Sequence, residues 1–267
     1  MFSTPILVFD IETIPDTPGL RRLHGLDPAL SDAEVAELAF QQRRAQTGHD
    51  FLPLHLQRIV AISCALRAGE TFKVWSLAAP ALSEAEILQR FFDGVEKFTP
   101  RLVSWNGSGF DLPVLHYRGL IHAISAARYW DMGEGNYADS REFRWNNYIN
   151  RYHTRHLDLM DLLALYQPRA NAPLDELARL AGFPGKLGMD GSKVWEAWLA
   201  GKADAIRDYC ETDVVNTYLV FNRFRLLSGE VDRATTDTEE TFVRAELARL
   251  NKPHWREYLE AWESTAP

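Results

Sequence analysis

Two acidic residues follow directly on a run of large apolar residues near the start of the chain. Ile6-Leu7-Val8-Phe9 leads without a break into Asp10-Ile11-Glu12. Such a run is typical of a strand that is buried on both faces. Residues two apart in a strand share a face, so both carboxylates project together from the end of the predicted strand. Carboxylates held this close raise each other's pKa unless a cation neutralises them, and Mg2+ or Mn2+ are the usual partners. A solvent-exposed strand end with two hydrated acids is the alternative for this stretch alone.

Two further acids lie on predicted helices, one at a helix N-terminus and one within a long helix. In Asn106-Gly-Ser-Gly-Phe110-Asp111, a turn precedes a helix, and Pro113 fits only in the first turn of that helix, which places Asp111 at its N-terminus. Tyr209 and Asp213 are four apart on a predicted helix over 204–227 and therefore share a face. Four converging carboxylates could hold two divalent ions roughly 3.5–4 Å apart, the arrangement used in phosphoryl transfer. The phenol could orient or deprotonate an attacking water.

The elements that would position these residues alternate between strands and helices. Apolar runs predict strands over 59–66 and 102–105, and 72–75 pairs with the first of these as a hairpin. Helical patterns cover 87–95, 175–181 and 192–199, and a helical insertion starts at residue 20. Ser31 and Ser83 each precede a capping-box acid. Two helices, 241–250 and 255–262, are expected in the tail. The pattern predicts an α/β protein.

Composition restricts the function classes. The chain has 267 residues, a net charge of −8 and only two cysteines, Cys64 and Cys210. Two cysteines build neither a disulfide framework nor a zinc cluster, and both are expected to be small core residues. The negative charge argues against a protein that grips a long nucleic-acid backbone, but not against an enzyme that handles a few nucleotides through bound cations. With no signal peptide and no apolar run of membrane length, we expect a cytoplasmic protein without membrane contact.

These motifs resemble those of the DEDD superfamily of 3′→5′ exonucleases, in its tyrosine-bearing branch. More narrowly, the chain is similar to the predicted exonucleases related to the proofreading domain of family-B DNA polymerases. Phe9-Asp10-Ile11-Glu12-Thr13, Asn106 to Asp111, and Tyr209-Cys-Glu-Thr-Asp213 match the three motifs in order. The resemblance implies an RNase H-like fold with a central mixed sheet flanked by helices. It also implies four metal ligands (Asp10, Glu12, Asp111 and Asp213) and Tyr209 as the partner of the nucleophilic water.

The resemblance covers about residues 5–227. We therefore expect an exonuclease domain over 1–227, with the helical insertion at 20–57, and a helical C-terminal extension over 228–267 that no family motif explains. The implied activity is two-metal 3′→5′ hydrolysis of single-stranded nucleic acid, with DNA favoured over RNA.

Candidate substrate contacts lie in and beside the motifs. Thr13, Asn106 and Phe110 belong to the motifs themselves. Trp145 and Tyr148 lie in the segment 141–156, where arginines alternate with aromatic residues, a pattern that suits phosphates and stacked bases. A β-hairpin arm whose aromatic side chains pack on the body is the alternative for this segment.

Several assignments stay open in the sequence. One of Asp158 and Asp161 is expected to support the site without binding metal. Lys186 either touches a phosphate or is a solvated loop lysine. A haloacid-dehalogenase-type phosphatase also begins with a strand and an acidic pair, but Glu12 stands where that family needs Asp. A catalytically silent binding or scaffold protein on this fold is a further alternative, although such proteins typically lose at least one of the four acids. The sequence does not decide the pathway or the oligomeric state.

Overall fold

The computed structural model describes residues 4–265 and centres on one five-stranded sheet. Its strands are β1 (Ile6–Pro15), β2 (Gln57–Ala68), β3 (Thr71–Ala78), β4 (Arg101–Ser104) and β5 (His156–Asp158). They lie in the order β3-β2-β1-β4-β5. β2 runs antiparallel to β1 and β3, whereas β4 is parallel to both β1 and β5. The expected α/β, RNase H-like architecture with a mixed central sheet is confirmed.

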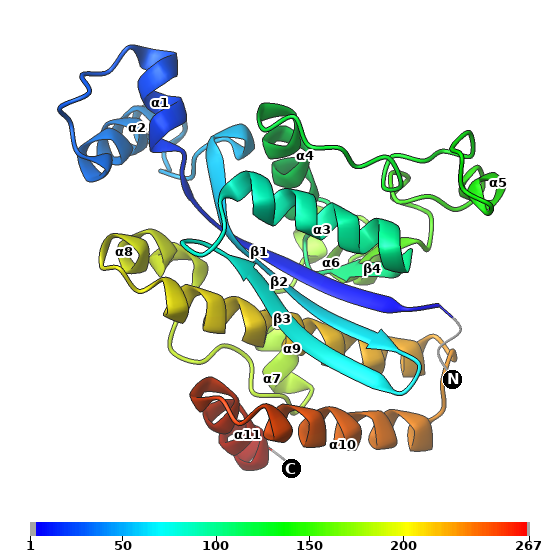
Figure 1. The fold of residues 1–267 in the computed structure, drawn as a ribbon. Helices are drawn as coiled ribbons and strands as arrows, with labels where there is room; N and C mark the ends of the chain where they lie inside the picture. Colours follow the sequence, from blue (N-terminus) through cyan, green and yellow to red (C-terminus); the bar gives the residue numbers. More distant parts are fainter. Residues whose placement is uncertain (1–3, 266–267) are drawn as a thin grey trace.

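Helices cover both faces of the sheet (Figure 1). One face packs against α3 (Glu84–Phe98) and α4 (Asp111–Ile121). The other packs against α9 (Ala203–Leu227), with α7 (Leu174–Leu180), α10 (Arg233–Leu250) and α11 (Pro253–Thr265) beyond it. The remaining helices are α1 (Thr17–His24), α2 (Asp32–Thr47), α5 (Ser140–Phe143), α6 (Leu159–Leu163) and α8 (Val194–Leu199). None of the described helices combines the length and apolar character that a membrane span needs.

Alternation along β1 decides which way the acidic pair points. Ile6 and Val8 pack into the core on the α9 side, and Leu7 and Phe9 pack on the α3 side. Asp10 and Glu12 continue the row of Ile6 and Val8, so both face α9. The prediction that the two carboxylates share a face is confirmed.

The sequence had led us to expect the acidic pair at the end of the strand. The pair lies instead within β1. β1 continues to Pro15 because β2 pairs with it over its whole length. Its pairing with β4, however, covers only Ile6 to Val8, since β4 is four residues long. The pair therefore follows directly after the point where one edge of β1 loses its neighbour strand.

The expected helix starts at Ser31 and Ser83 are confirmed as capping boxes, in which Glu34 and Glu86 accept from the backbone of their N-cap serines. The first of these begins α2. With α1, α2 builds a small separate core around Leu20, Val35 and Leu52, at one end of the sheet (Figure 1).

The tail is more helical than its sequence suggested. α10 begins at Arg233, eight residues before the predicted start, because Asp232 caps it by accepting a hydrogen bond from the Thr235 backbone N–H. α10 and α11 place Val243, Trp255 and Tyr258 in the same core as α9 and the sheet. The tail is therefore part of the main hydrophobic core.

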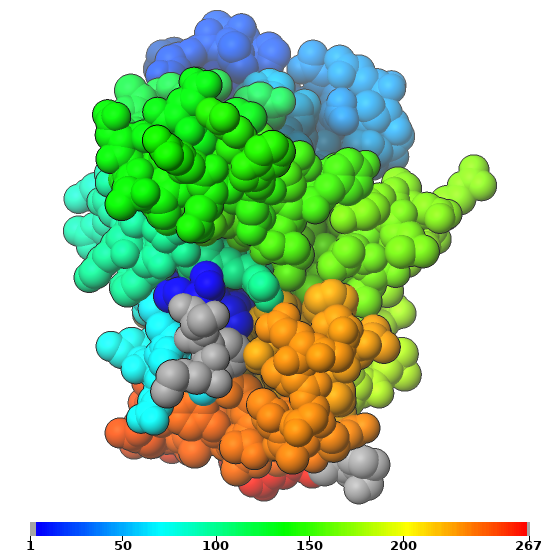
Figure 2. Space-filling view, turned by 90° about the vertical axis from the view of Figure 1, so that its right-hand side faces the viewer, coloured from blue at the N-terminus to red at the C-terminus, as the bar shows by residue number. Residues whose placement is uncertain are grey.

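The segment 141–156 forms no β-hairpin. It contains the end of the short helix α5 and then turns, before β5 begins at His156. Figure 2 shows the region around α5 (green) above the start of β1 (dark blue), with α9 and α10 (orange) below.

Candidate active site

One cleft of about 630 Å3 brings the predicted catalytic residues together. It opens beside the unpaired edge of β1 and draws on β1, the N-terminus of α4 and the second and third turns of α9. Its lining includes the five predicted catalytic residues, two of the predicted substrate contacts and one loop lysine: Asp10, Glu12, Asp111, Tyr209, Asp213, Asn106, Phe110 and Lys186.

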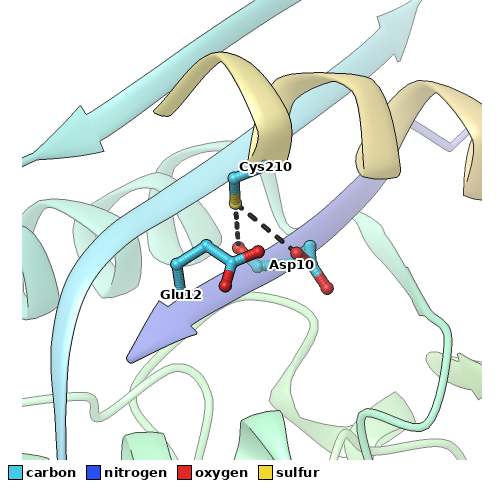
Figure 3. A group of neighbouring side chains, drawn as sticks. All are labelled: Asp10, Glu12 and Cys210. Atoms are coloured by element: carbon cyan, nitrogen blue, oxygen red, sulfur yellow. Dashed lines mark hydrogen bonds between the residues drawn. The ribbon is translucent and has the colours of Figure 1, made fainter. Parts of the chain in front are cut away.

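Cys210 of α9 lies directly over the acidic pair (Figure 3). Its Sγ is 3.5 Å from both the backbone oxygen and Oδ2 of Asp10, and a ligand atom from each of Asp10, Glu12 and Cys210 lies within 4.8 Å of the other two. Burial raises the pKa of the thiol well above its usual range. The protonated thiol therefore acts as a hydrogen-bond donor to Asp10. The sequence predicted a core cysteine and missed this second role.

Asp111 is held by the open edge of β1. Its Oδ1 accepts a hydrogen bond from the Ile11 backbone N–H at 3.1 Å. This N–H belongs to the part of β1 that β4 does not reach. Burial raises the pKa of Asp111 to about 7, although backbone hydrogen bonds, including the one from Ile11, favour its charged form.

Asp158 shapes the turn that leads to Asp111. Its two carboxylate oxygens accept from the backbone N–H groups of Asn106 at 3.0 Å and Ser108 at 2.8 Å. Gly107 lies between them, where a Cβ would clash with Ser104 Oγ, so only glycine fits this turn. Asp158 is therefore the supporting acid that the sequence expected. Asp161 instead pairs with Arg151.

Lys186 joins the helical half of the site. Its Nζ donates to the Tyr209 hydroxyl at 2.5 Å and lies 3.5 Å from Asp213 Oδ2. Burial, and then the Asp213 carboxylate, raise the pKa of the Tyr209 phenol far above its usual range. In the metal-free cleft Tyr209 is therefore a neutral phenol, whose hydroxyl can orient a water. Lys186 thus lies inside the cleft and is not a lysine of a solvated loop, and its contact with a phosphate stays a prediction.

Burial is the main reason why the carboxyl pKa values rise in this cleft. It is the largest cause for Asp10 and Glu12, whose pKa values lie well above the usual range, and for Asp213, whose pKa is also raised. The neighbouring carboxylates come second for Asp10 and Glu12, whereas Lys186 opposes the shift at Asp213. The sequence had led us to expect repulsion as the main cause.

The residues fit a hard divalent cation. Among the described residues, no hydrogen-bond donor reaches the buried Oδ1 of Asp213, and a buried carboxylate oxygen without a donor is suited to a metal. The other candidate donors are the carboxylates of Asp10, Glu12 and Asp111. Carboxylate oxygens of this kind suit hard divalent cations.

Phe110 lines the cleft beside a second aromatic ring that the sequence did not single out. The ring of Phe51 lies 5.9 Å from that of Phe110, and Phe51 is 52% exposed. Its loop is fixed, because Arg43 donates to the Phe51 carbonyl and Gln57 to that of the buried Leu52.

Thr13 does not line the cleft. Its hydroxyl donates to Gln57 Oε1 at 3.0 Å, the same Gln57 whose amide holds the loop beside Phe51. A direct substrate contact by Thr13 stays a prediction, and its hydroxyl contacts Gln57 of β2, which in turn holds the loop.

The proposed base-stacking role of Tyr148 is wrong. Its side chain is 1% exposed, its hydroxyl donates to the Pro100 carbonyl at 2.7 Å, and its ring stacks on Tyr129. Only part of the arginine–aromatic pattern packs inward: the Arg155 guanidinium lies 3.9 Å from the centre of the Phe143 ring, whereas Trp145 and Tyr152 are exposed. These cation–π contacts stabilise the segment itself.

Trp145 is 78% exposed but is not among the residues that line the cleft. Its role in substrate binding stays a prediction.

Comparison with known proteins identifies the family. A family model described as "Predicted 3'-5' exonuclease related to the exonuclease domain of PolB" matches residues 49–262. The chain belongs to this family of predicted exonucleases. The match covers the second and third motifs as well as all of α10 and most of α11. A search of the curated proteins gave no match.

Among solved structures, the chain is similar to E. coli exonuclease I in complex with a 5cy-dT13 oligonucleotide. The two share 12% sequence identity with a TM-score of 0.30. The likeness covers 86% of this chain and 45% of that one, so the chain spans less than half the length of that relative.

The raised carboxyl pKa values predict that the metal-free protein loses stability as the pH rises. Between the unfolded value of about 4 and the folded values, of which that of Asp111 is about 7, the folded state keeps protons that the unfolded state has released. The free energy of unfolding therefore falls across this window. Thermal melts in EDTA between pH 5 and pH 8 measure it.

Glu12→Gln tests the same cluster at one residue. At pH 7.5 the substitution should raise the Tm of the metal-free protein and reduce the Tm increase that Mn2+ gives, because it removes one buried charge and one ligand. Glu70→Gln, in the exposed β2–β3 turn, is the matched control. A lower Tm, or a Mn2+ response equal to that of wild type, would contradict the prediction.

Proposed function

We propose that this chain is a divalent-metal-dependent 3′→5′ exonuclease that acts on single-stranded nucleic acid, with DNA favoured over RNA. The observation that carries the proposal is the cleft in which Asp10, Glu12, Asp111 and Asp213 meet next to Tyr209. The family's relation to a polymerase exonuclease domain supports DNA as substrate and the 3′→5′ direction. All four acids are present, which argues against the catalytically silent alternative.

The four carboxylates would hold two Mg2+ or Mn2+ ions in this mechanism. When bound, these ions would activate water and stabilise charge on the phosphate oxygens. The chain's own groups supply orientation. The Tyr209 hydroxyl would bind the attacking water and orient the water oxygen toward phosphorus. Lys186, an ammonium in the same cleft, would attract the phosphate and fix the phenol by its hydrogen bond.

An aromatic pair formed by Phe110 of the cleft and its neighbour Phe51 supports single-strand specificity. Phe110 lines the cleft, and Phe51 beside it exposes about half of its surface on a fixed loop. Aromatic rings bind bases by stacking, worth about 1–3 kcal/mol per base. A base must leave a duplex before it can stack in this way, so a paired 3′ end should be a poor substrate.

Digestion of labelled oligonucleotides tests the activity and its direction. With Mn2+ or Mg2+, 5′-labelled single-stranded DNA should shorten one nucleotide at a time, whereas 3′-labelled DNA should release its label first as a mononucleotide. Single-stranded RNA and a blunt duplex should be cut more slowly. Binding without any metal-dependent release of nucleotides would support the silent alternative.

Asp10→Asn and Asp213→Asn should each lower kcat by at least about 100-fold, because each removes one charge that would hold a metal and with it transition-state stabilisation. Circular dichroism and thermal melts should show a folded protein in both variants. Near-normal turnover in either variant would disprove the four-ligand assignment.

Tyr209→Phe should lower kcat, on the order of 100-fold, with little effect on KM. The ring keeps its packing in the core formed with Ile206 and Val194, and only the hydroxyl is lost. Steady-state kinetics on a short oligonucleotide measure the effect. An unchanged kcat would make Tyr209 a packing residue only.

Phe51→Ala should raise KM for single-stranded DNA. If the ring stacks on a base, the loss in binding free energy should be about 1–3 kcal/mol. Hydrolysis of the p-nitrophenyl ester of thymidine 5′-monophosphate, which has no second base, should hardly change. Trp145→Ala is the comparison, since Trp145 is also an exposed aromatic residue but lies in the segment 141–156. An increase in KM for Trp145→Ala alone would move the path of the strand to the segment 141–156.

A further inference from the structure

The loop over residues 182–188, called the lysine loop below, carries Lys186, and three hydrogen bonds with side chains outside the loop hold its backbone. The Lys186 N–H donates to Asp175 Oδ1 at 2.6 Å, and its carbonyl accepts from Arg179 Nη2 at 3.0 Å. The preceding carbonyl, that of Gly185, accepts from Asn216 Nδ2 at 2.8 Å. Gly185 has a φ of +69°, which favours glycine. A loop fixed in this way holds the Lys186 side chain at a defined position beside Tyr209.

The C-terminal helix α11 lies against this same loop. The Tyr258 hydroxyl donates to Asn216 Oδ1 at 2.8 Å, so Asn216 connects α11 to the carbonyl beside Lys186. Further along α11, the Trp262 ring lies edge-on to that of Phe183, 5.7 Å away. The tail therefore contacts the lysine loop directly at Phe183 and is connected to it a second time through Asn216 of α9.

The link through Asn216 is buried and specific. Asn216 and Tyr258 are both 0% exposed, so each polar group that lost its partner would be left without water. The amide oxygen of Asn216 is used by α11 and the amide nitrogen by the loop. Because both ends of the amide are committed, a shift of α11 is transmitted to Gly185.

The start of α11 is anchored to α9. Glu211 of α9 is 1% exposed and pairs with Lys252 at 3.0 Å and with His254 at 2.9 Å. It lies between Tyr209 and Asp213 in the sequence of α9. The tail is thus tied both to the helix that carries these two residues and to the loop that carries Lys186.

We propose that α11 is a positioning element of the active site. Tyr258 acts through Asn216 and Gly185 to fix Lys186, whose Nζ contacts the Tyr209 hydroxyl. Tyr258 is a positioning residue, since it lines no part of the cleft. The proposal rests on the proposed function and gives the C-terminal extension a task within it.

Tyr258→Phe tests the proposal against a matched control. Tyr218→Phe also removes one buried hydroxyl from the same core, but Tyr218 donates to Glu239 of α10, which pairs with Arg67 of β2. Tyr258→Phe should lower kcat about fivefold or more, the effect of one lost hydrogen bond, with KM within about twofold of wild type. Tyr218→Phe should leave kcat unchanged.

A double variant separates positioning from general stability. In a Lys186→Met background, Tyr258→Phe should cause no further loss of kcat, because the group that it positions is gone. Losses that multiply, or a Tyr258→Phe variant with unchanged kcat, would overturn the proposal.

Hydrogen exchange gives a readout that does not need activity. Tyr258→Phe should speed exchange in the peptide 182–188, and Tyr218→Phe should not. An unchanged peptide in Tyr258→Phe would overturn the proposal. A wild-type protein without nuclease activity would overturn the proposed function instead, and hydrogen exchange would still decide whether α11 holds the loop.

Discussion

The cost of gathering buried carboxylates in one cleft is the constraint on which the rest of this structure depends. Asp10, Glu12, Asp111 and Asp213 all have raised pKa values, and burial is the first cause for each. Such groups stay together only where the surrounding scaffold fixes them. A bound cation would remove most of this cost, which is why the cluster supports a metal-dependent function.

The scaffold positions the acids by leaving one edge of β1 open. β4 pairs with β1 only as far as Val8, so the next part of the strand is free to hold Asp111 through the Ile11 N–H. On the α9 side, the apolar row of Ile6 and Val8 fixes the face on which the acids emerge. β1 and the N-terminus of α4 thus meet at the cleft because the pairing of β1 with β4 ends at Val8.

The features that were predicted from the sequence are those fixed by local geometry. A spacing of two in a strand placed Asp10 and Glu12 on one face, and a spacing of four in a helix placed Tyr209 beside Asp213. Pro113 fixed the start of α4 at Asp111. Motif order then identified the family.

The features that the sequence did not reveal depend on tertiary packing. The same arginine–aromatic alternation can face a nucleic acid or the protein interior, and Tyr148 faces the interior. Phe51 and Lys186 come from loops whose place beside the cleft follows from the fold and not from any period. The link from Tyr258 to Lys186 runs through residues far apart in the chain, so no local pattern could indicate it.

Anomalous diffraction from a Mn2+-loaded crystal with a bound mononucleotide tests the central claim most directly. The proposed site predicts two Mn2+ peaks roughly 3.5–4 Å apart among Asp10, Glu12, Asp111 and Asp213, and the loss of at least one peak in Asp10→Asn. The described residues contain a second cluster of possible ligands, Asp208, Glu211 and His254, which already pairs internally. Mn2+ at that cluster alone, or no Mn2+ among the four carboxylates, would contradict the two-metal site.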